Sequence, residues 1–190
     1  MFDPIHVGHL WLARFALERM SLHQVLLVPA ADPPHKTPRG DTAPGEDRWT
    51  MVLRALRGVP GLKGSRIELE RTGKSYTVDT LAELASLHPD WELFLIIGGD
   101  NVRQMPTWHE PQQILQRCTV VAGSRPAEEA DESCAFEQYV VRLDIPRLDI
   151  SSTDVRRRLA AGLPVRYLVP EAVERYIHER GLYGAAREPS

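Results

Sequence analysis

The chain has 190 residues, of which 43% are hydrophobic, and this length and composition suit one globular domain. Its 23 lysines and arginines are outnumbered by 26 aspartates and glutamates, which gives a formal net charge of −3. This balance argues against a protein drawn to nucleic acid or to an acidic membrane by a general positive field. Any anion that the chain binds must therefore be held by local groups.

The sequence shows no sign of a membrane or secretory class. No apolar run reaches the roughly 18 residues of a membrane span, and the first residues do not resemble a signal peptide. Only two cysteines occur, Cys118 and Cys134, and their spacing fits neither a disulfide framework nor a zinc site. We therefore expect a cytoplasmic protein in which both thiols are structural.

Short β-rich runs alternate with longer helical patterns, which is typical of βαβ units around a parallel sheet. Continuous apolar runs such as VLLV and LFLII are typical of strands buried on both faces. The predicted strands are 24–30, 65–70, 91–99, 118–124 and 139–146. The predicted helices lie near 8–20, 46–57, 77–88, 110–117, 152–161 and 170–180. The expected fold class is α/β, with a Rossmann-like, doubly wound parallel sheet and helices on both faces.

The connections between these elements predict one domain over residues 1–190, with a helical segment at about 151–182. No internal repeat or linker divides the chain. The Pro-rich stretch 30–45 is longer than a plain connector needs to be, which favours a functional loop. Near the end of the chain, Ser151 and Ser152 can cap the helix that follows them, and Gly162 can end it.

Two histidines, His6 and His9, stand at the start of the first predicted helix, within FDPIHVGH. Free backbone N–H groups and the positive end of the helix dipole favour an anion at this place, and imidazole donors would strengthen such a site. The same residue types also suit a helix-capping histidine or part of a zinc site, although zinc needs further ligands. The two histidines alone leave these interpretations open.

A second helix start carries similar chemistry in DISSTDVRRRL, residues 149–159. Its hydroxyls and first amides can hold a phosphate, and Arg156, one turn into the helix, can bind phosphate oxygens with two donors. A plain cap followed by a basic, solvated face is the alternative, and it is what we expect of Arg157 and Arg158. Two such helix starts in one small α/β chain favour a nucleoside triphosphate as ligand.

These two motifs resemble the paired signatures of the nucleotidyltransferase α/β-phosphodiesterase superfamily. The segments VPAADPPHK, SYTVDTL, LIIGGDN and MPTWHEP are similar, in the same order, to the markers of the bacterial nicotinate-nucleotide adenylyltransferase family. The resemblance extends from residue 2 to about residue 180. It implies transfer of AMP from ATP, with Mg²⁺, to nicotinate mononucleotide in NAD biosynthesis. The attacking phosphate is already an anion, so the reaction needs positioning and charge stabilisation rather than a general base.

The resemblance also implies roles for single residues. His6, His9 and Arg156 would be catalytic and would stabilise the charge on the transferred group. The implied ATP-binding residues are Gly98, Asp100, Ser151, Ser152, Thr153 and Arg156. The glycine and aspartate would contact the ribose, beyond the carboxyl end of a strand, where ligands of open α/β sheets bind. No resident metal ligand is implied, and Mg²⁺ would come with ATP.

For the second substrate the resemblance implies a ring site and a phosphate site. The substrate-binding residues would be His35, Lys36, Thr77, Trp108 and His109. Trp108 would stack on the pyridine ring, while Thr77 and the backbone amide of His109 would receive the ring carboxylate. His35 and Lys36 would face phosphate, although a solvated role for Lys36 is an equal alternative. A purely structural role for Trp108 is compatible with ring stacking.

The family pattern begins with a strand and glycines that this chain, which matches only from Phe2, does not contain. We therefore expect the true start upstream and the first strand of the sheet to be missing from the N-terminus. The alternatives are an adenylyltransferase for nicotinamide mononucleotide or phosphopantetheine, and a non-catalytic nucleotide-binding protein. Trp108, Thr77 and the PPHK loop disfavour phosphopantetheine, and the short, acidic chain disfavours an aminoacyl-tRNA synthetase fragment. A homo-oligomer is compatible with the sequence.

Overall fold

The computed structural model describes residues 1–33, 42–124, 134, 136–146 and 148–186. Contacts divide the chain into two compact units, each assembled from separate stretches. Unit 1 comprises Met1–Trp11, His23–Lys74 and Leu148–Ser190, and unit 2 comprises Leu12–Leu22 and Ser75–Arg147. The single domain over the whole chain stays a prediction.

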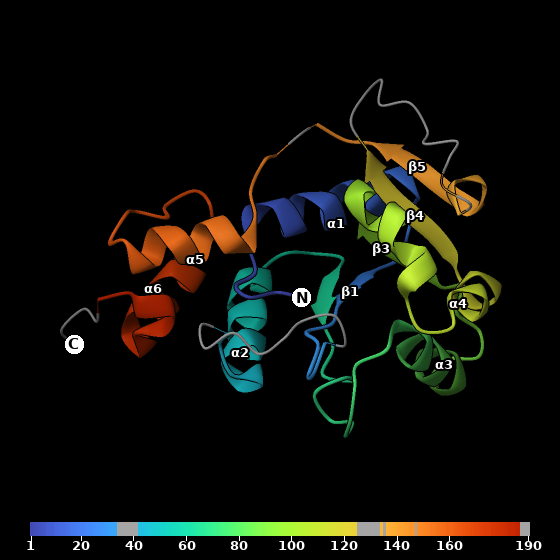
Figure 1. Cartoon of the computed structure of the whole chain (residues 1–190), viewed down its shortest axis with the longest axis horizontal. Coiled ribbons are helices and arrows are strands. Elements are labelled where there is room, and N and C mark those ends of the chain that lie inside the picture. Colours follow the sequence, from blue (N-terminus) through green and yellow to red (C-terminus); the bar gives the residue numbers. More distant parts are fainter. Residues whose placement is uncertain (34–41, 125–133, 135, 147, 187–190) are drawn as a thin grey trace. The chain divides into compact units, whose positions relative to one another are not determined.

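Figure 1 labels the helices and strands in chain order. The strands are β1 (Val25–Leu27), β2 (Leu62–Gly64), β3 (Phe94–Gly98), β4 (Thr119–Ser124) and β5 (Val140–Asp144). The α-helices are α1 (Val7–Arg19), α2 (Gly45–Leu56), α3 (Thr77–Leu87), α4 (Pro111–Arg117), α5 (Ser152–Ala160) and α6 (Glu171–Arg180). Short 3₁₀ helices are η1 (Gly99–Thr107), η2 (Glu137–Tyr139) and η3 (Leu182–Gly184).

Unit 2 is built on a three-stranded parallel sheet in the order β3–β4–β5. Successive residues of a strand point to opposite faces, and the central strand β4 shows this alternation. Val120 and Ala122 belong to a core with η1, α3 and α4, whereas Val121 packs with Phe15 and Ala16 of α1. Both faces of this sheet are therefore covered by helices, as predicted for a doubly wound fold.

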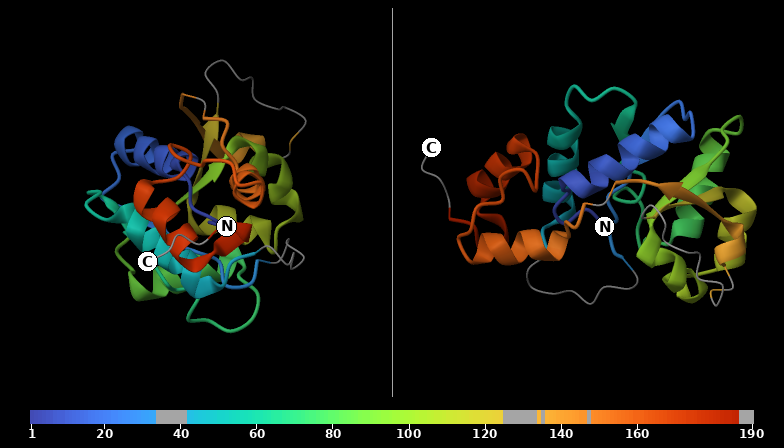
Figure 2. Two further views of the ribbon diagram at one scale, coloured as in Figure 1. Left: turned by 90° about the vertical axis from the view of Figure 1, so that its left-hand side faces the viewer. Right: turned by 90° about the horizontal axis from the view of Figure 1, so that it is seen from above.

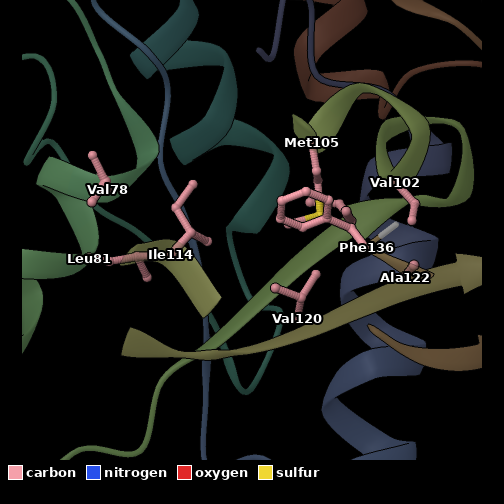
Figure 3. Packing of buried hydrophobic residues seen from close by; sticks show 9 residues of the cluster. Val78, Leu81, Val102, Met105, Ile114, Val120, Ala122 and Phe136 are labelled. Carbon is pink, nitrogen blue, oxygen red and sulfur yellow. The ribbon is translucent and has the colours of Figure 1, made fainter. Parts of the chain in front are cut away.

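The larger of these cores lies on the side of α3, α4 and η1. Figure 3 shows Val102, Met105 and Phe136 gathered over the strand that carries Val120 and Ala122. Val102 and Met105 are fully buried. The core therefore anchors η1, the segment that follows the carboxyl end of β3.

A glycine on β4 allows the opposite core to close. A Cβ atom at Gly123 would lie 2.7 Å from Cδ1 of Leu12 and 2.9 Å from Cδ1 of Ile145. These separations are shorter than van der Waals contact, so a larger residue would push the helix and the strand apart. The sequence therefore needs glycine here for packing.

Cys118 lies between α4 and β4. Its Sγ donates a hydrogen bond to the carbonyl of Ile114 at 3.3 Å. Burial raises the pKa of this thiol to about 11, which agrees with the structural role expected for it.

Unit 1 contains a parallel pair of strands, β1 and β2, in which Val25 is opposite Leu62. Helix α2 covers this pair. A Cβ atom at Gly64 would lie 2.7 Å from the indole ring of Trp49, so the aromatic side chain packs directly on the strand backbone. Met51 and Val52 of the same helix are fully buried.

Helix α6 packs beside α2, as both views of Figure 2 show. Polar contacts join the two helices. Arg54 pairs with Glu179 at 3.0 Å, and its guanidinium lies 4.4 Å from the centroid of the Tyr176 ring. The hydroxyl of Tyr176 donates to Oδ1 of Asp47 at 2.7 Å. This buried aspartate therefore has a phenol as its hydrogen-bond donor.

The prediction of a strand at 65–70 is wrong. These residues form a turn in which the amides of Leu69 and Glu70 donate to the carbonyl of Arg66. The guanidinium of Arg66 also pairs with Glu46 and Glu70. The apolar alternation at Ile67 and Leu69 therefore marks one side of a turn, and the parallel strand ends at Gly64.

The remaining predicted elements are confirmed with small shifts at their ends, and the Rossmann-like α/β class is confirmed. Within the described residues the strands form two hydrogen-bonded sheets, one in each unit. The expectation of an upstream start stays a prediction. No helix in the described part of the chain is long and apolar enough to cross a membrane.

Candidate nucleotide-binding site

The pair of histidines His6 and His9 lies at the N-terminus of α1. His6 directly precedes the helix, and its carbonyl accepts from the amide of His9 at 3.0 Å. In return, Nδ1 of His9 accepts from the amide of His6 at 3.2 Å. The bond to Nδ1 is one half of a capping box, with a histidine in place of glutamate at the third helical position. Because Nδ1 is an acceptor, a neutral His9 ring carries its proton on Nε2.

The two imidazoles are stacked, with ring centroids 3.6 Å apart and an interplanar angle of 25°. His6 is only 5% exposed, and burial lowers its pKa to about 4. It is therefore neutral at pH 7. Its Nδ1 has no hydrogen-bond partner among the described residues. A buried polar atom of this kind is costly unless a water or a ligand completes it.

Gly8 lies against the His6 ring. A Cβ atom at this position would be 3.1 Å from Nδ1 of His6 and 3.7 Å from the carbonyl oxygen of Ile150. The glycine of the HxGH motif therefore leaves room beside an unsatisfied nitrogen. It also shows that the segment before α5 approaches the first turn of α1.

The N-terminus of α5 has the cap that the sequence predicts. Oγ of Ser151 accepts from the amide of Asp154 at 3.1 Å, and Ser151 is exposed. Oγ of Ser152 donates to the carbonyl of Pro4 at 3.0 Å. The residues before His6 and the first turn of α5 are therefore joined, although they are 148 positions apart in the sequence.

Arg156 is buried within this junction, with 8% of its surface exposed. Its Nη1 donates to the carbonyl of Asp3 at 2.7 Å, and its Nη2 lies 3.5 Å from Oγ1 of Thr153. The guanidinium is thus held at the first turn of α5, on the side of the predicted phosphate ligands. Among the sequence-predicted residues, unit 1 brings together His6, His9, Ser152, Thr153 and Arg156.

The neighbouring arginines make contacts outside this junction. Arg157 is largely exposed and pairs with Asp154 at 2.9 Å. Nε of Arg158 donates to the carbonyl of Pro164, near Gly162, which has a positive φ of 66° at the end of α5. These contacts fix the ends of the helix.

In unit 2, two glycines follow each other where β3 ends, and they differ in their surroundings. A Cβ atom at Gly99 would lie 2.9 Å from the carbonyl oxygen of Gly123. At Gly98 the nearest atom would be Nδ2 of Asn101, at 3.4 Å, which is ordinary contact. Gly99 is therefore required by the adjacent strand, whereas the protein itself leaves room at Gly98. Asp100 is exposed in the first turn of η1.

The predicted ring-binding residues also lie in unit 2. Thr77 is the first residue of α3 and is half-buried. Trp108 ends η1, packs against the large core and donates its amide to the carbonyl of Met105. The ring of His109 is exposed and lies 4.2 Å from that of Tyr76, centroid to centroid. The residues that precede α3 and follow η1 are therefore neighbours.

Two predicted site residues lie outside the part of the chain that the structure describes, and two further residues have no predicted role. His35 and Lys36 lie outside the described residues, and their roles stay predictions. The sequence motifs assigned no role to Asp3 or Tyr76, whose contacts link several predicted site residues. The one sequence feature that could indicate a role for Asp3 is its place just before the histidine motif. Its partners, however, are far away in the sequence and no spacing rule indicates them.

The described residues contain no group of three His, Cys, Asp or Glu side chains that could hold a metal ion. Mg²⁺ in proteins is commonly bound through one or two carboxylates together with substrate phosphates.

The fold is that of an α/β protein, and the two helix starts offer donors of the kind that bind nucleotide phosphates. Comparison with known families agrees, since the cytidylyltransferase-like family matches residues 1–158. The chain belongs to this family.

Two relatives within the family have the same name. A protein of Thermus thermophilus, named as a probable nicotinate-nucleotide adenylyltransferase, is 48% identical over 182 residues, or 96% of this chain and 95% of its own. A protein of the same name from Halalkalibacterium halodurans is 43% identical over 96% of this chain and 87% of its own.

A solved structure has a similar fold. The nicotinic acid mononucleotide adenylyltransferase of Plasmodium falciparum, in complexes with APC and with NaAD, gives a TM-score of 0.78 at 20% identity. The match covers 98% of this chain and 95% of that one. This likeness supports the fold.

Proposed function

We propose that the chain is a nicotinate-nucleotide adenylyltransferase. An oxygen of the 5′-phosphate of nicotinate mononucleotide forms a bond to the α-phosphorus of ATP. The bond from that phosphorus to the bridging oxygen of the β-phosphate breaks, and pyrophosphate leaves with the electron pair. The products are nicotinate adenine dinucleotide and pyrophosphate, and no proton has to be removed from the nucleophile.

One observation carries the assignment of the phosphates: the starts of α1 and α5 meet within unit 1. Ser152 and Arg156 donate to the backbone of the two residues Asp3 and Pro4, just before the histidine motif. Two sets of helix N-terminal amides, two imidazoles and one guanidinium are thus available to a polyanion. Such donors stabilise charge that builds up on the transferred phosphoryl group.

In this proposal the histidines act as hydrogen-bond donors rather than as bases. His9 presents an Nε2–H donor, because its Nδ1 is used by the cap. His6 is neutral at pH 7 and supports the stacked ring of its neighbour. Arg156 supplies the positive charge, and Mg²⁺ enters bound to ATP and neutralises charge on its phosphates.

Selection of the nicotinate ring falls to unit 2. Trp108 offers a ring face for stacking. The hydroxyl of Thr77 and the amide of His109 offer neutral donors to a carboxylate. An amide ring would use these donors less well, which favours the acid over nicotinamide mononucleotide. His35 and Lys36 would bind the phosphate of the mononucleotide.

A pyrophosphate-release assay with ATP and Mg²⁺ tests the proposal. We expect turnover with nicotinate mononucleotide and a kcat/KM at least about 10-fold lower with the nicotinamide form. Phosphopantetheine should give no pyrophosphate. Binding of ATP without pyrophosphate release from any of the three acceptors would identify a non-catalytic nucleotide-binding protein instead.

A further inference from the structure

Asp3 is the most buried charged residue of the described chain, with 1% of its surface exposed. Its Oδ1 accepts hydrogen bonds from the amide of Ala43 at 3.1 Å and from the hydroxyl of Tyr183 at 2.8 Å. Its Oδ2 makes no hydrogen bond within the described residues and lies 3.8 Å from Nη1 of Arg156. The two oxygens of the carboxylate are therefore used differently.

A carboxylate in such a position needs positive partners, because burial of an unpaired charge is very costly. Two buried arginines supply them. Arg156 contacts both the carbonyl and the carboxylate of Asp3. The side chain of Arg48 donates to the carbonyls of Ala30 and Ala43. Burial lowers the pKa of Arg48, and the charge of Asp3 opposes that shift.

Tyr183 bonds to Oδ1 of Asp3, the oxygen that is not paired with Arg156. It belongs to η3, 180 positions away in the sequence. Burial, and then the negative charge of Asp3, raise the pKa of this phenol, so the hydroxyl keeps its proton and remains a donor. With Oδ1 occupied by Tyr183 and Ala43, only Oδ2 and the backbone carbonyl of Asp3 remain for the guanidinium.

From this geometry we infer that Asp3 is a positioning residue for Arg156, and that Tyr183 holds Asp3 in the required orientation. The carbonyl of Asp3 accepts from Nη1, and its carboxylate attracts the same nitrogen through Oδ2 at 3.8 Å. Together they hold the guanidinium plane with Nη2 on the side of Thr153 at the start of α5. The inference rests on the proposed function for its effect on turnover. Its geometric part concerns only contacts within unit 1.

The same unit contains a matched control. Asp47, also buried, accepts from the hydroxyl of Tyr176 at 2.7 Å and lies 3.3 Å from Nε of Arg180. It thus has the same three side-chain types as the cluster of Asp3, Tyr183 and Arg156. It joins α2 to α6, however, and neither Tyr176 nor Arg180 is a predicted site residue. Substitutions there measure the structural cost alone.

The first experiment compares Asp3→Asn with Asp47→Asn in the full chain. We expect Asp3→Asn to lower kcat on the order of 10- to 100-fold, as misplacing a catalytic group does, while Asp47→Asn changes kcat less than about twofold. Thermal unfolding of each variant shows whether a loss of kcat comes from a loss of folded protein. An equal loss of kcat in the two variants would overturn the inference. If Asp3→Asn does not fold, Tyr183→Phe against Tyr176→Phe gives the same comparison with a smaller loss.

The second experiment separates positioning from a direct role of Asp3. In an Arg156→Lys background, Asp3→Asn should cause no further loss of kcat, because the group that it orients has been removed. A full additional loss would show that Asp3 acts independently of Arg156, against the inference.

A nuclear magnetic resonance measurement gives a readout without turnover. The side-chain signals of Arg156, assigned by their disappearance in Arg156→Lys, should show slow rotation of the guanidinium in the unaltered protein and fast rotation in Asp3→Asn. Slow rotation in both would contradict the inference. If the unaltered protein shows no adenylyl transfer, the proposed function fails, and this measurement still decides the role of Asp3.

Discussion

The candidate residues of unit 1 and unit 2 are held in place in different ways. In unit 1, His9, Ser152 and Arg156 are fixed by hydrogen bonds to backbone atoms, and Arg156 is buried. In unit 2, Trp108 is positioned by packing on an apolar core, and Asp100 and His109 are exposed. Groups that stabilise developing charge must be oriented before the reaction. Groups that bind a ring need mainly shape and surface.

This contrast predicts that substitutions in unit 1 lower kcat, whereas those in unit 2 raise KM. His9→Ala should have the largest effect, a loss of kcat on the order of 100- to 1000-fold, as for removal of one charge-stabilising donor. The KM of either substrate should change little. His9→Gln separates the two roles of the residue, because glutamine restores the capping acceptor and not the imidazole. Recovery of turnover in His9→Gln would show that the cap and not the imidazole donor is needed, against the proposed difference between the two units.

Trp108→Ala should raise the KM for nicotinate mononucleotide about 10-fold, which corresponds to about 1.4 kcal/mol of lost stacking and burial. The KM for ATP should stay the same. Trp91, a more exposed tryptophan stacked on His88, is the control, and its replacement by alanine should leave both KM values unchanged. Steady-state kinetics with each substrate varied in turn would measure this. An effect confined to ATP would assign Trp108 to the other substrate.

The adjacent glycines of unit 2, Gly98 and Gly99, allow an effect on ligand binding to be separated from an effect on stability. Gly99→Ala should destabilise the fold by about 1 to 3 kcal/mol through overpacking against β4. Gly98→Ala should leave the unfolding free energy nearly unchanged and raise the KM for ATP a few fold, because any clash would be with the ligand. Urea unfolding and kinetics on both variants test this. Equal destabilisation by the two substitutions would count against a ligand-facing Gly98.

The smallest expected effect concerns the pH dependence of stability in unit 1. The pKa of His6 is about 4 in the folded chain and about 6.5 when unfolded. The unfolded state therefore gains the proton first as the pH falls. The contribution of His6 to the free energy of unfolding should be nearly complete above about pH 6.5 and fall as the pH drops toward 4, by about 1.4 kcal/mol at pH 5.5. In His6→Gln this part of the decline should vanish, whereas His23→Gln, at an exposed position, should retain it.

Much of this architecture is predictable from local pattern. The apolar runs of β3 and β4 and the cap at Ser151 are confirmed, since each depends on neighbours in sequence. The prediction of a strand in the turn after β2 is wrong because an alternating pattern does not distinguish a strand from a turn with one buried side.

The role of Asp3 could not be predicted for a different reason. Its partners Tyr183 and Arg156 are 180 and 153 positions away, and only the tertiary fold brings them together. The contact between the rings of Tyr76 and His109 cannot be predicted from local sequence for the same reason. Spacing within a motif reports on one helix start, whereas orientation of a buried charge depends on several distant segments.

The half-buried thiol of Cys118 in unit 2 has a practical consequence for handling the protein. Thiolates rather than thiols react with alkylating agents and oxidants, and with a pKa of about 11 only about one Cys118 in ten thousand is ionised at pH 7. This side chain should resist maleimides and mild peroxide while the fold is intact. The rate at which Cys118 is modified would then report how often the interface between α4 and β4 opens.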